Sequence, residues 1–410
     1  MQKSYTMSAK QFLKRVLYFP VSPVATKFLF SAGGDGSDPG HPPKAILVIR
    51  LDEIGDMVLT TPFLRELRRN HPRAHITLVV KPAVKNLVEL CPYCDELVTF
   101  DWQAPRLLAP FIRHVRAYRL AKAKLRRRSY DWAVIPRWDY DCYSATVLAY
   151  FSGARRRIAF SERVSPQKTE TNRGYDLLLT DPAPGTVSSH EVLMTLSLLS
   201  HLGDQIASDA LELWLSDADH RFAMEQLPDD PWRMTIAIAP GALEKNRQWP
   251  VENYLALAVW AVQKFDARIV VLGGSVETAL GKKLVPGARE DSINDLTGRT
   301  TLRQAAAVLA RSALFIGNDT GLKHIAAAMG VRVVEISRFP KNGAPMHRQS
   351  PFRFRAWGVE SIVLQPEQAP PPCGDNCMAR KAHCILGVDL QSVKEAVIGL
   401  VSAGMGRQCS

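Results

Sequence analysis

The segment ALFIGNDTGLKHIAAAMGVRVVEIS, residues 313–337, contains a predicted strand, turn, helix and second strand in direct succession. The flanking runs ALFIG (313–317) and VRVVEIS (331–337) are apolar and rich in β-branched residues, which is typical of buried strands. LKHIAAAM (322–329) is typical of a helix. A strand, a helix and a second strand in this order form the βαβ unit of a parallel sheet.

The turn inside this segment has the character of a phosphate site. Asp319, Thr320 and Gly321 lie at the predicted helix N-terminus, where free backbone N–H groups and the helix dipole favour an anion. Lys323 and His324 follow within the first turn. His324 alone could be a packed histidine, but beside Asn-Asp-Thr-Gly we favour a ligand role. A carboxylate would repel a phosphate, so Asp319 is expected to cap the helix or to contact the uncharged part of the ligand.

The same alternation of strands and helices occurs twice along the chain. It predicts an α/β protein with two Rossmann-like domains that face one another across a cleft. The predicted strands are 45–51, 76–80, 96–100, 132–136 and 157–160 in the first domain, and 234–239, 267–273, 292–296, 313–317 and 331–337 in the second.

Turn-forming and acidic residues mark the predicted boundaries. SAGGDGSDPGHPP precedes the first strand, and Asp and Pro residues cluster around 215–232. We expect the helix over 389–403 to pack back across both domains. The predicted parts are an N-terminal extension and linker over 1–43, a first domain over 44–218, a second domain over 232–388, and a C-terminal helix and tail over 389–410.

The composition restricts the class of protein. The 410 residues are 46% hydrophobic and carry a formal net charge of +12, which suits a globular protein with an anionic partner. Seven cysteines are too few for a disulfide scaffold and indicate a cytosolic enzyme. No apolar run reaches eighteen residues, so no spanning helix is expected.

Two basic segments could contact a phosphorylated or membrane surface. The first thirty residues could form a basic amphipathic helix lying on a membrane, or simply a frayed tail. Pro20, Pro23 and Lys27 interrupt the apolar stretch and argue against a signal peptide. A second basic helix is predicted over 106–128 and is either a solvated face or a patch for acceptor phosphates. Its arginines at spacing three are Arg113, Arg116 and Arg119.

The turn after the first strand, RLDEIGDMVLTTP, offers a carboxylate at the start of a helix. Gly55 permits a tight backbone path, and Asp56 follows it. Asp56 could cap the helix, or it could act as a general base at the C-terminal end of a central strand. The spacing alone favours the cap.

Two turns in the second half add candidate ligand-binding residues. APGALEKNRQWP (239–250) contains Lys245 and Arg247, and a cation here could neutralise a diphosphate, although an ordinary surface loop is equally compatible. LGGSVET (272–278) places Glu277 after a glycine pair, where it could accept ribose hydroxyls.

The cysteines near the C-terminus raise the question of a metal. Cys373, Cys377 and Cys384, together with His383, could in principle hold zinc. Their spacing fits no common zinc module, so plain thiols on a structured loop are favoured and no metal is expected.

Taken together, these turns resemble glycosyltransferase family 9, the heptosyltransferases of lipopolysaccharide core synthesis. The resemblance covers roughly residues 44–400 and rests on ILVIRLDEIGDMVLTTPFLRELRRNHP, PGALEKNRQWPVENY and GNDTGLKHIAAAMG in this order. The segment CGDNCMARKAHC also resembles a loop found late in many members. The family implies a GT-B architecture, in which the first domain binds the acceptor and the second binds ADP-heptose.

The resemblance also implies roles for individual residues. Asp56 would be the catalytic base. Arg247 would be the phosphate-binding cation two positions before the Trp-Pro pair, where many members have lysine. The remaining donor-binding residues implied are Asp319, Thr320, Gly321, His324 and Glu277. The sequence departs from the family at Arg338, Phe339, Pro340 and Lys341, which replace a loop of small residues and leave the donor open.

The resemblance implies inverting, metal-independent transfer of a heptose without a cofactor. The expected partners are a nucleotide-sugar donor, a phosphorylated lipid-linked oligosaccharide acceptor and the inner face of the inner membrane, contacted peripherally by a cytoplasmic enzyme. No nucleic acid is expected. The alternatives are a transferase with another nucleotide sugar or acceptor, a nucleotide-sugar epimerase, and a non-catalytic basic protein that binds nucleic acid or acidic membrane.

Overall fold

The computed structural model describes residues 23, 26–27, 42–105, 108–185, 189–230, 233–285, 292–374 and 376–405. Nearly all of the predicted N-terminal extension, including the amphipathic helix considered for it, lies outside the described residues. Within the described ranges, no helix combines the length and the hydropathy needed to cross a bilayer.

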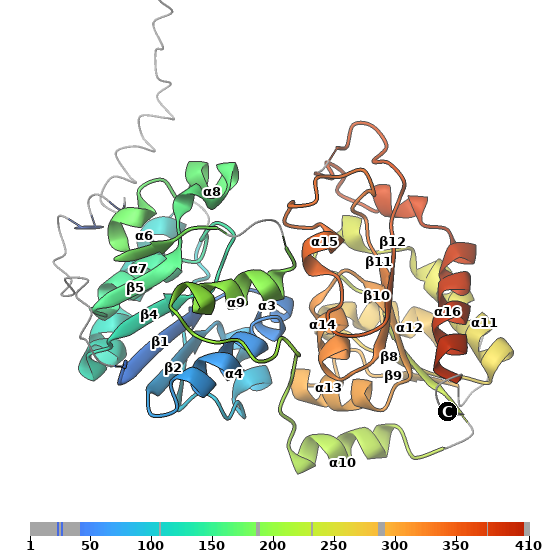
Figure 1. Ribbon diagram of the computed structural model, residues 1–410. Helices are drawn as coiled ribbons and strands as arrows, with labels where there is room; N and C mark the ends of the chain where they lie inside the picture. The colour runs from blue at the N-terminus through green and yellow to red at the C-terminus, as the bar shows by residue number, and fades with distance from the viewer. Residues whose placement is uncertain are drawn as a thin grey trace, which may run out of the picture.

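Two six-stranded parallel sheets form the framework of the protein (Figure 1). Their strand orders are β3-β2-β1-β4-β5-β6 and β12-β11-β10-β7-β8-β9. In each sheet the order in which the chain adds strands reverses beside the first strand, as it does in Rossmann-like sheets. The predicted α/β fold with two Rossmann-like units is confirmed. The strands are β1 (Ala45–Arg50), β2 (His75–Val80), β3 (Glu96–Thr99), β4 (Trp132–Ile135), β5 (Arg156–Phe160), β6 (Asp181–Ala183), β7 (Thr235–Ala239), β8 (Arg268–Val271), β9 (Ile293–Asp295), β10 (Leu314–Asn318), β11 (Arg332–Ile336) and β12 (Ser361–Leu364).

Helices cover both faces of the first sheet because its central strands are apolar on both sides. Ile46 and Val48 of β1 pack with α4 and α9, whereas Leu47 and Ile49 face α6 and α7. The helices of this unit are α3 (Ile54–Val58), α4 (Thr61–Asn70), α5 (Lys85–Val88), α6 (Ala109–Leu120), α7 (Ala145–Ser152), α8 (Pro166–Thr171) and α9 (Glu191–His201). The predicted basic helix is present in its described part, as α6 followed by a π turn (Ala121–Leu125) and a 3-10 turn (Arg126–Arg128).

The second sheet is covered in the same way. Ile236 and Ile238 of β7 pack with α11 and α16, and Ala237 and Phe315 lie in the core with α13 and α14. That core continues without interruption into the first unit. The helices here are α11 (Val251–Phe265), α12 (Thr278–Leu284), α13 (Leu302–Ala310), α14 (Gly321–Ala328), α15 (Pro351–Phe354) and α16 (Leu390–Met405).

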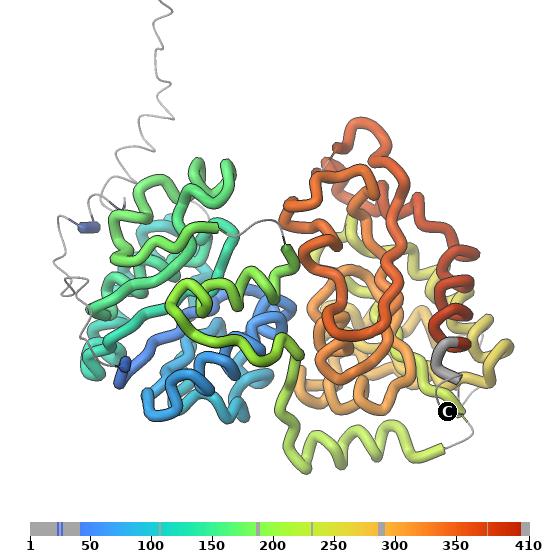
Figure 2. The backbone as a smooth tube through the Cα atoms, in the orientation of Figure 1, coloured from blue at the N-terminus to red at the C-terminus, as the bar shows by residue number. Residues whose placement is uncertain are grey.

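The segment that joins the units contains a helix of its own. The chain leaves α9 and crosses to α10 (Asp217–Gln226), which packs on α13 (Figure 2). Ser216 and Asp219 form a reciprocal capping box at its start. Two of the acidic residues that the sequence presents as linker signals, Asp217 and Asp219, therefore lie in the first turn of a helix.

The expectation for the C-terminal helix is wrong. In the described residues α16 packs on α11, β11 and β12, at the side of the second sheet that lies away from the first unit (Figure 1). Val393, Val397 and Leu400 join the core of the second unit. The helix lies there because its apolar face matches the uncovered face of β11 and β12.

Buried ion pairs connect the two units. Glu191, at the start of α9, accepts a hydrogen bond of 2.8 Å from Arg353 of α15 and lies 3.4 Å from Arg50 at the end of β1. Arg353 is fully buried and also contacts Asp139 at 3.2 Å. Arg353 therefore brings a charge of the second unit into an acidic pocket of the first.

Arg353→Ala tests whether this pairing holds the units together. The variant removes the cation that donates to buried Glu191, and loss of one partner from a buried pair costs about 3–5 kcal/mol. We expect the free energy of unfolding in urea to fall by that amount. Arg128→Ala is the matched control, because its pair with Glu96 (2.9 Å) is exposed and such pairs contribute about 0–1 kcal/mol. A decrease in the free energy of unfolding no larger than that of the control would refute the role of Arg353 in holding the two units together.

Candidate functional site

A cleft of about 530 Å³ lies between the two units. It is lined by the turns that follow β1 and β4 in one sheet and β7 and β10 in the other. These are the neighbouring strands at which each sheet order reverses, where open α/β sheets bind ligands. The cleft brings together most of the residues expected from the sequence: Asp56, Arg247, Glu277, Asp319, Thr320, Gly321 and His324.

Asp56 caps a helix and also faces the cleft. It is the third residue of α3, and its Oδ2 accepts a hydrogen bond from the Glu53 backbone N–H at 3.3 Å. Its side chain keeps 24% of its surface exposed, and it lines the cleft. The two roles that the sequence offers as alternatives are therefore compatible, because the cap uses one carboxylate oxygen.

Burial raises the pKa of Asp56 to about 6. Arg50, 3.5 Å away, opposes this shift, while Glu191 and Glu53 add to it. A carboxylate with such a pKa is charged at neutral pH but is more basic than an exposed aspartate. These are the properties of a general base.

A buried network holds the walls beside Asp56. Arg50 donates to the Pro136 carbonyl and lies 3.3 Å from Asp52, which also pairs with Arg137. Arg137 and Asp139 follow β4 and line the cleft. The network fixes two turns of the first sheet relative to one another.

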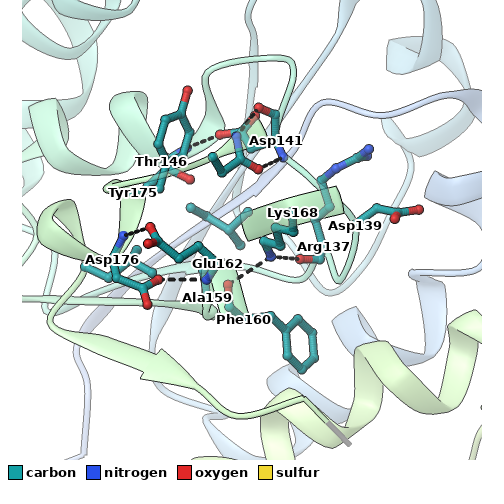
Figure 3. Close-up of a pocket in the computed structure, with 13 residues that line it drawn as sticks. Arg137, Asp139, Asp141, Thr146, Ala159, Phe160, Glu162, Lys168, Tyr175 and Asp176 are labelled. Atoms are coloured by element: carbon teal, nitrogen blue, oxygen red, sulfur yellow. Dashed lines mark hydrogen bonds between the residues drawn. The ribbon is translucent and has the colours of Figure 1, made fainter. Parts of the chain in front are cut away.

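Lys168 of α8 supports the turn that follows β4 (Figure 3). The Lys168 Nζ donates to the carbonyls of Trp138 at 3.1 Å and Phe160 at 2.9 Å. Burial lowers the pKa of Lys168 to about 8. Because its hydrogen bonds end on backbone carbonyls, Lys168 positions the loop that carries Arg137 and Asp139.

On the opposite wall, Arg247 is oriented by Asp319. Arg247 belongs to the short turn η7 (Lys245–Arg247) and donates to the Asp319 carbonyl at 2.8 Å and to its carboxylate. The same carboxylate lies 2.6 Å from Lys323, which in turn lies 2.6 Å from Glu335. Burial would raise the pKa of Asp319, but Arg247 and Lys323 hold it well below its ordinary value. Asp319 thus organises the turn through its ion pairs with Arg247 and Lys323.

The N-terminus of α14 presents two polar atoms without partners. Thr320 Oγ1 and His324 Nδ1 are buried and accept or donate no hydrogen bond among the described residues. Burial holds the pKa of His324 well below its ordinary value, so the imidazole is neutral. Both residues line the cleft, and since buried polar atoms are normally paired, these two are candidates for a partner that the described residues do not supply.

Glycines allow the two walls to touch. A Cβ on Gly55 would lie 2.6 Å from His324 Cδ2, and a Cβ on Gly321 would lie 2.8 Å from Ile54 Cβ. The starts of α3 and α14 are therefore in contact across the cleft. Asp56 and the N-terminal end of α14 therefore line the same cleft. Further along the wall, Glu277 packs directly against Gly241.

Other residues expected from the sequence lie elsewhere. Lys245 is exposed and does not line the cleft. Arg113 donates to the carbonyls of Trp102 (3.0 Å) and Cys142 (2.7 Å), and Arg116 donates to that of Asp101 (3.2 Å). Both arginines therefore hold neighbouring loops. Arg119 is exposed on α6.

Several residues of the site were missed by sequence reasoning. Arg50 could have been noticed, because it ends a buried strand directly before the Asp56 turn. Asp139, Glu191 and Arg353 carry no local signal, since their pairing joins positions far apart in the chain.

Comparison with known proteins agrees with this geometry. The model of glycosyltransferase family 9 (heptosyltransferase) matches residues 118–341, which include parts of both units. Lipopolysaccharide heptosyltransferase 2 of Escherichia coli K12 is 22% identical over 298 residues, covering 71% of this chain and 82% of that protein.

Two solved structures share the architecture. The glycosyl transferase family 9 protein of Veillonella parvula superposes with a TM-score of 0.70 at 20% identity, covering 88% of this chain and 98% of that chain. The ADP-heptose lipopolysaccharide heptosyltransferase II of Escherichia coli gives 0.65 at 19% identity, covering 88% and 99%. The implied GT-B architecture is confirmed, and the chain belongs to glycosyltransferase family 9 (heptosyltransferase).

Proposed function

We propose that the protein transfers a heptose from ADP-heptose to the inner core of lipopolysaccharide, with inversion at the anomeric carbon. The observation that carries the proposal is the contact between Gly55 and His324, which sets Asp56 beside the N-terminus of α14. A base and an anion-binding helix end on facing walls suit a reaction in which a hydroxyl is deprotonated while a diphosphate departs.

In the proposed step, Asp56 accepts the proton of an acceptor hydroxyl as its oxygen attacks the anomeric carbon. The bond between that carbon and the diphosphate oxygen breaks through an oxocarbenium-like state. A single displacement of this kind inverts the configuration.

The leaving diphosphate would be met by Arg247 and by the free backbone N–H groups at Gly321. Asp319 keeps Arg247 directed at this helix end through the 2.8 Å bond to its carbonyl. The negative charge that develops on the leaving group is then stabilised by groups already in place. The step as proposed uses no metal ion and no cofactor.

The remaining donor contacts are assigned to Thr320, His324 and Glu277, all of which line the cleft. The unusual loop after β11 braces this wall, because Arg338 donates to Gln349 at 2.8 Å and lies 2.8 Å from Glu244. ADP-heptose is proposed as the donor because it appears in the name of the Escherichia coli structural relative.

A phosphorylated, lipid-linked acceptor fits the net charge of +12. We propose that the enzyme meets it at the cytoplasmic face of the inner membrane through peripheral contact. Arg116 and Arg119, which are exposed on α6, are the candidates of the basic helix for this contact.

The test of function is a donor panel with purified protein and a truncated core acceptor. We expect transfer from ADP-heptose and little transfer from UDP-sugars. Transfer is measured as the increase in mass of the acceptor by mass spectrometry. Asp56→Asn and Asp56→Ala should lower kcat by about 100- to 10,000-fold, the usual contribution of a general base. Asp101→Asn is the control, because Asp101 is exposed outside the cleft. Near-normal turnover in both Asp56 variants would exclude it as the base, and an isomerised donor without transfer would indicate an epimerase.

The pH dependence gives an independent test of Asp56. The carboxylate form is the base, so activity is present above its pKa and is lost as the pH falls through about 6. We expect kcat/KM to drop about tenfold per pH unit below that value and to level off above it. A midpoint near 4, the value of an exposed aspartate, would contradict the role of burial.

Gly55→Ala tests the contact between the walls. The added Cβ must push α3 away from His324, and a displacement of about 1 Å at a reacting centre can cost on the order of 100-fold in rate. We expect kcat/KM to fall at least about tenfold with little change in Tm. Gly399→Ala is the control, because the nearest atom to its Cβ is 3.9 Å away. Equal activity of the two variants would refute the proposed arrangement.

A further inference from the structure

Four side chains of the types that can bind soft metals lie close together in the connection between β12 and α16. They are Cys373, Cys377, His383 and Cys384, and the ligand atoms of all four lie within 4.8 Å of one another. The group lies outside the catalytic cleft, whose lining includes none of them. The transfer reaction therefore gives no reason for this arrangement.

The distances match the edges of a zinc-centred tetrahedron. Cys377 Sγ lies 3.8 Å from the Sγ atoms of Cys373 and Cys384, and His383 Nδ1 lies 3.5 Å from each of these two sulfurs. Zinc binds sulfur at about 2.3 Å and imidazole nitrogen at about 2.0–2.1 Å. Tetrahedral angles then place two sulfurs about 3.8 Å apart, and a sulfur and a nitrogen about 3.5–3.6 Å apart. Sulfurs 3.8 Å apart are also much too distant for a disulfide.

The backbone around the group suits bound thiolates. The Met378 N–H donates to Cys373 Sγ at 3.3 Å, a contact that favours negative charge on the sulfur. Arg380 and Lys381 occur in the same loop and supply positive charge against three thiolates. Three cysteines and one histidine complete a four-coordinate set and leave no open position, which is characteristic of structural zinc rather than catalytic zinc.

The loop is attached directly to the turn that carries Arg247. Asn246, which precedes Arg247 in η7, donates from Nδ2 to the Ala379 carbonyl at 2.7 Å. Trp249 donates from Nε1 to the Val388 carbonyl at 2.8 Å. Ala379 lies between two of the four metal-binding candidates in the chain. Fixing the loop therefore fixes one side of the Arg247 turn.

The segment needs such a fixed point. Between Leu364 and Leu390, its described residues contain one short helical turn, η9 (Cys384–Gly387), and otherwise irregular backbone. Irregular segments of this length seldom hold a single conformation without an additional constraint. A metal that links residues of this loop supplies that constraint.

We propose that Cys373, Cys377, His383 and Cys384 bind one structural Zn²⁺ ion, which fixes their loop against the Arg247 turn. The spacing of these residues favours plain thiols over a metal, and the proposal replaces that expectation.

Elemental analysis of protein purified without a polyhistidine tag tests the site. We expect about one zinc per chain in the wild type, and at least a tenfold lower zinc content in Cys377→Ser and Cys384→Ser. Cys94→Ser is the matched control and should retain the zinc. Its sulfur also lies 3.8 Å from a second one, that of Cys91, but the pair belongs to no larger ligand group among the described residues. Metal-free wild-type protein, or iron in place of zinc, would overturn the proposal.

A second measurement covers the case in which the cysteine variants do not fold. Titration of the folded wild type with an organomercurial should release one zinc per chain, detected with a zinc-sensitive dye, and should lower Tm. Replacement by Co²⁺ should give the absorption bands of tetrahedral thiolate coordination. Cobalt spectra without thiolate bands would overturn the proposed ligand set.

The link to the Arg247 turn has its own readout. Zinc-depleted enzyme should show at least a several-fold lower kcat, with the donor KM changed less, because Arg247 is proposed to stabilise charge that develops on the leaving group, and added Zn²⁺ should restore kcat. This experiment rests on the proposed transferase activity, whereas the zinc content and the cobalt spectrum do not. An unchanged kcat after zinc loss would overturn the positioning role.

Discussion

The buried contact of Glu191 with Arg50 and Arg353 is the interaction on which the arrangement of the site depends. Arg50 ends the central strand of the first sheet, and Arg353 comes from the second unit, so Glu191 joins both. Burial would raise the pKa of Glu191, but Arg353 and Arg50 hold it below its ordinary value and keep it charged. The same Arg50 limits how far burial raises the pKa of Asp56. The guanidinium group of Arg50 thus contributes both to the contact between the domains and to the pKa of Asp56, the proposed base.

The second unit uses the same kind of construction around a different charge. Asp319 is surrounded by Arg247 and Lys323, and Lys323 is paired in turn with Glu335. This alternation lets a cation remain at the end of α14 in a largely buried setting, because each charge has an opposite neighbour. On both walls, the side chain proposed to act in the reaction, Asp56 or Arg247, is partly exposed and is paired with buried charged residues. The buried residues fix the orientation of these two side chains, and their exposed atoms are proposed to contact the substrates.

Local signals in the sequence were sufficient for most of the fold and for the outline of the site. The ten predicted strands are all present and, like helix α11, follow from hydrophobic patterning. β6 and β12 were missed; β6 contains Pro182 and is too short to give a pattern. Asp56, Arg247 and Thr320 lie in the segments that follow β1, β7 and β10, so their convergence could be predicted from topology. The pairing of Glu191 with Arg353 could not, because it depends on how distant segments pack and the spacing along the chain contains no record of that. The four candidate ligands around Cys377 were recognised in the sequence, but their spacing did not predict that their ligand atoms lie within 4.8 Å of one another.

The continuous core between the two units has a consequence for how such enzymes diversify. Ala237 and Val48 belong to one apolar cluster although they lie in different sheets, and Glu191 and Arg353 seal its polar edge. Neither half is then an interchangeable module. A chimera that takes its donor half from another enzyme would inherit an interface shaped for a foreign partner. New specificities in this scaffold are therefore more accessible through substitutions in the cleft turns than through recombination of whole domains.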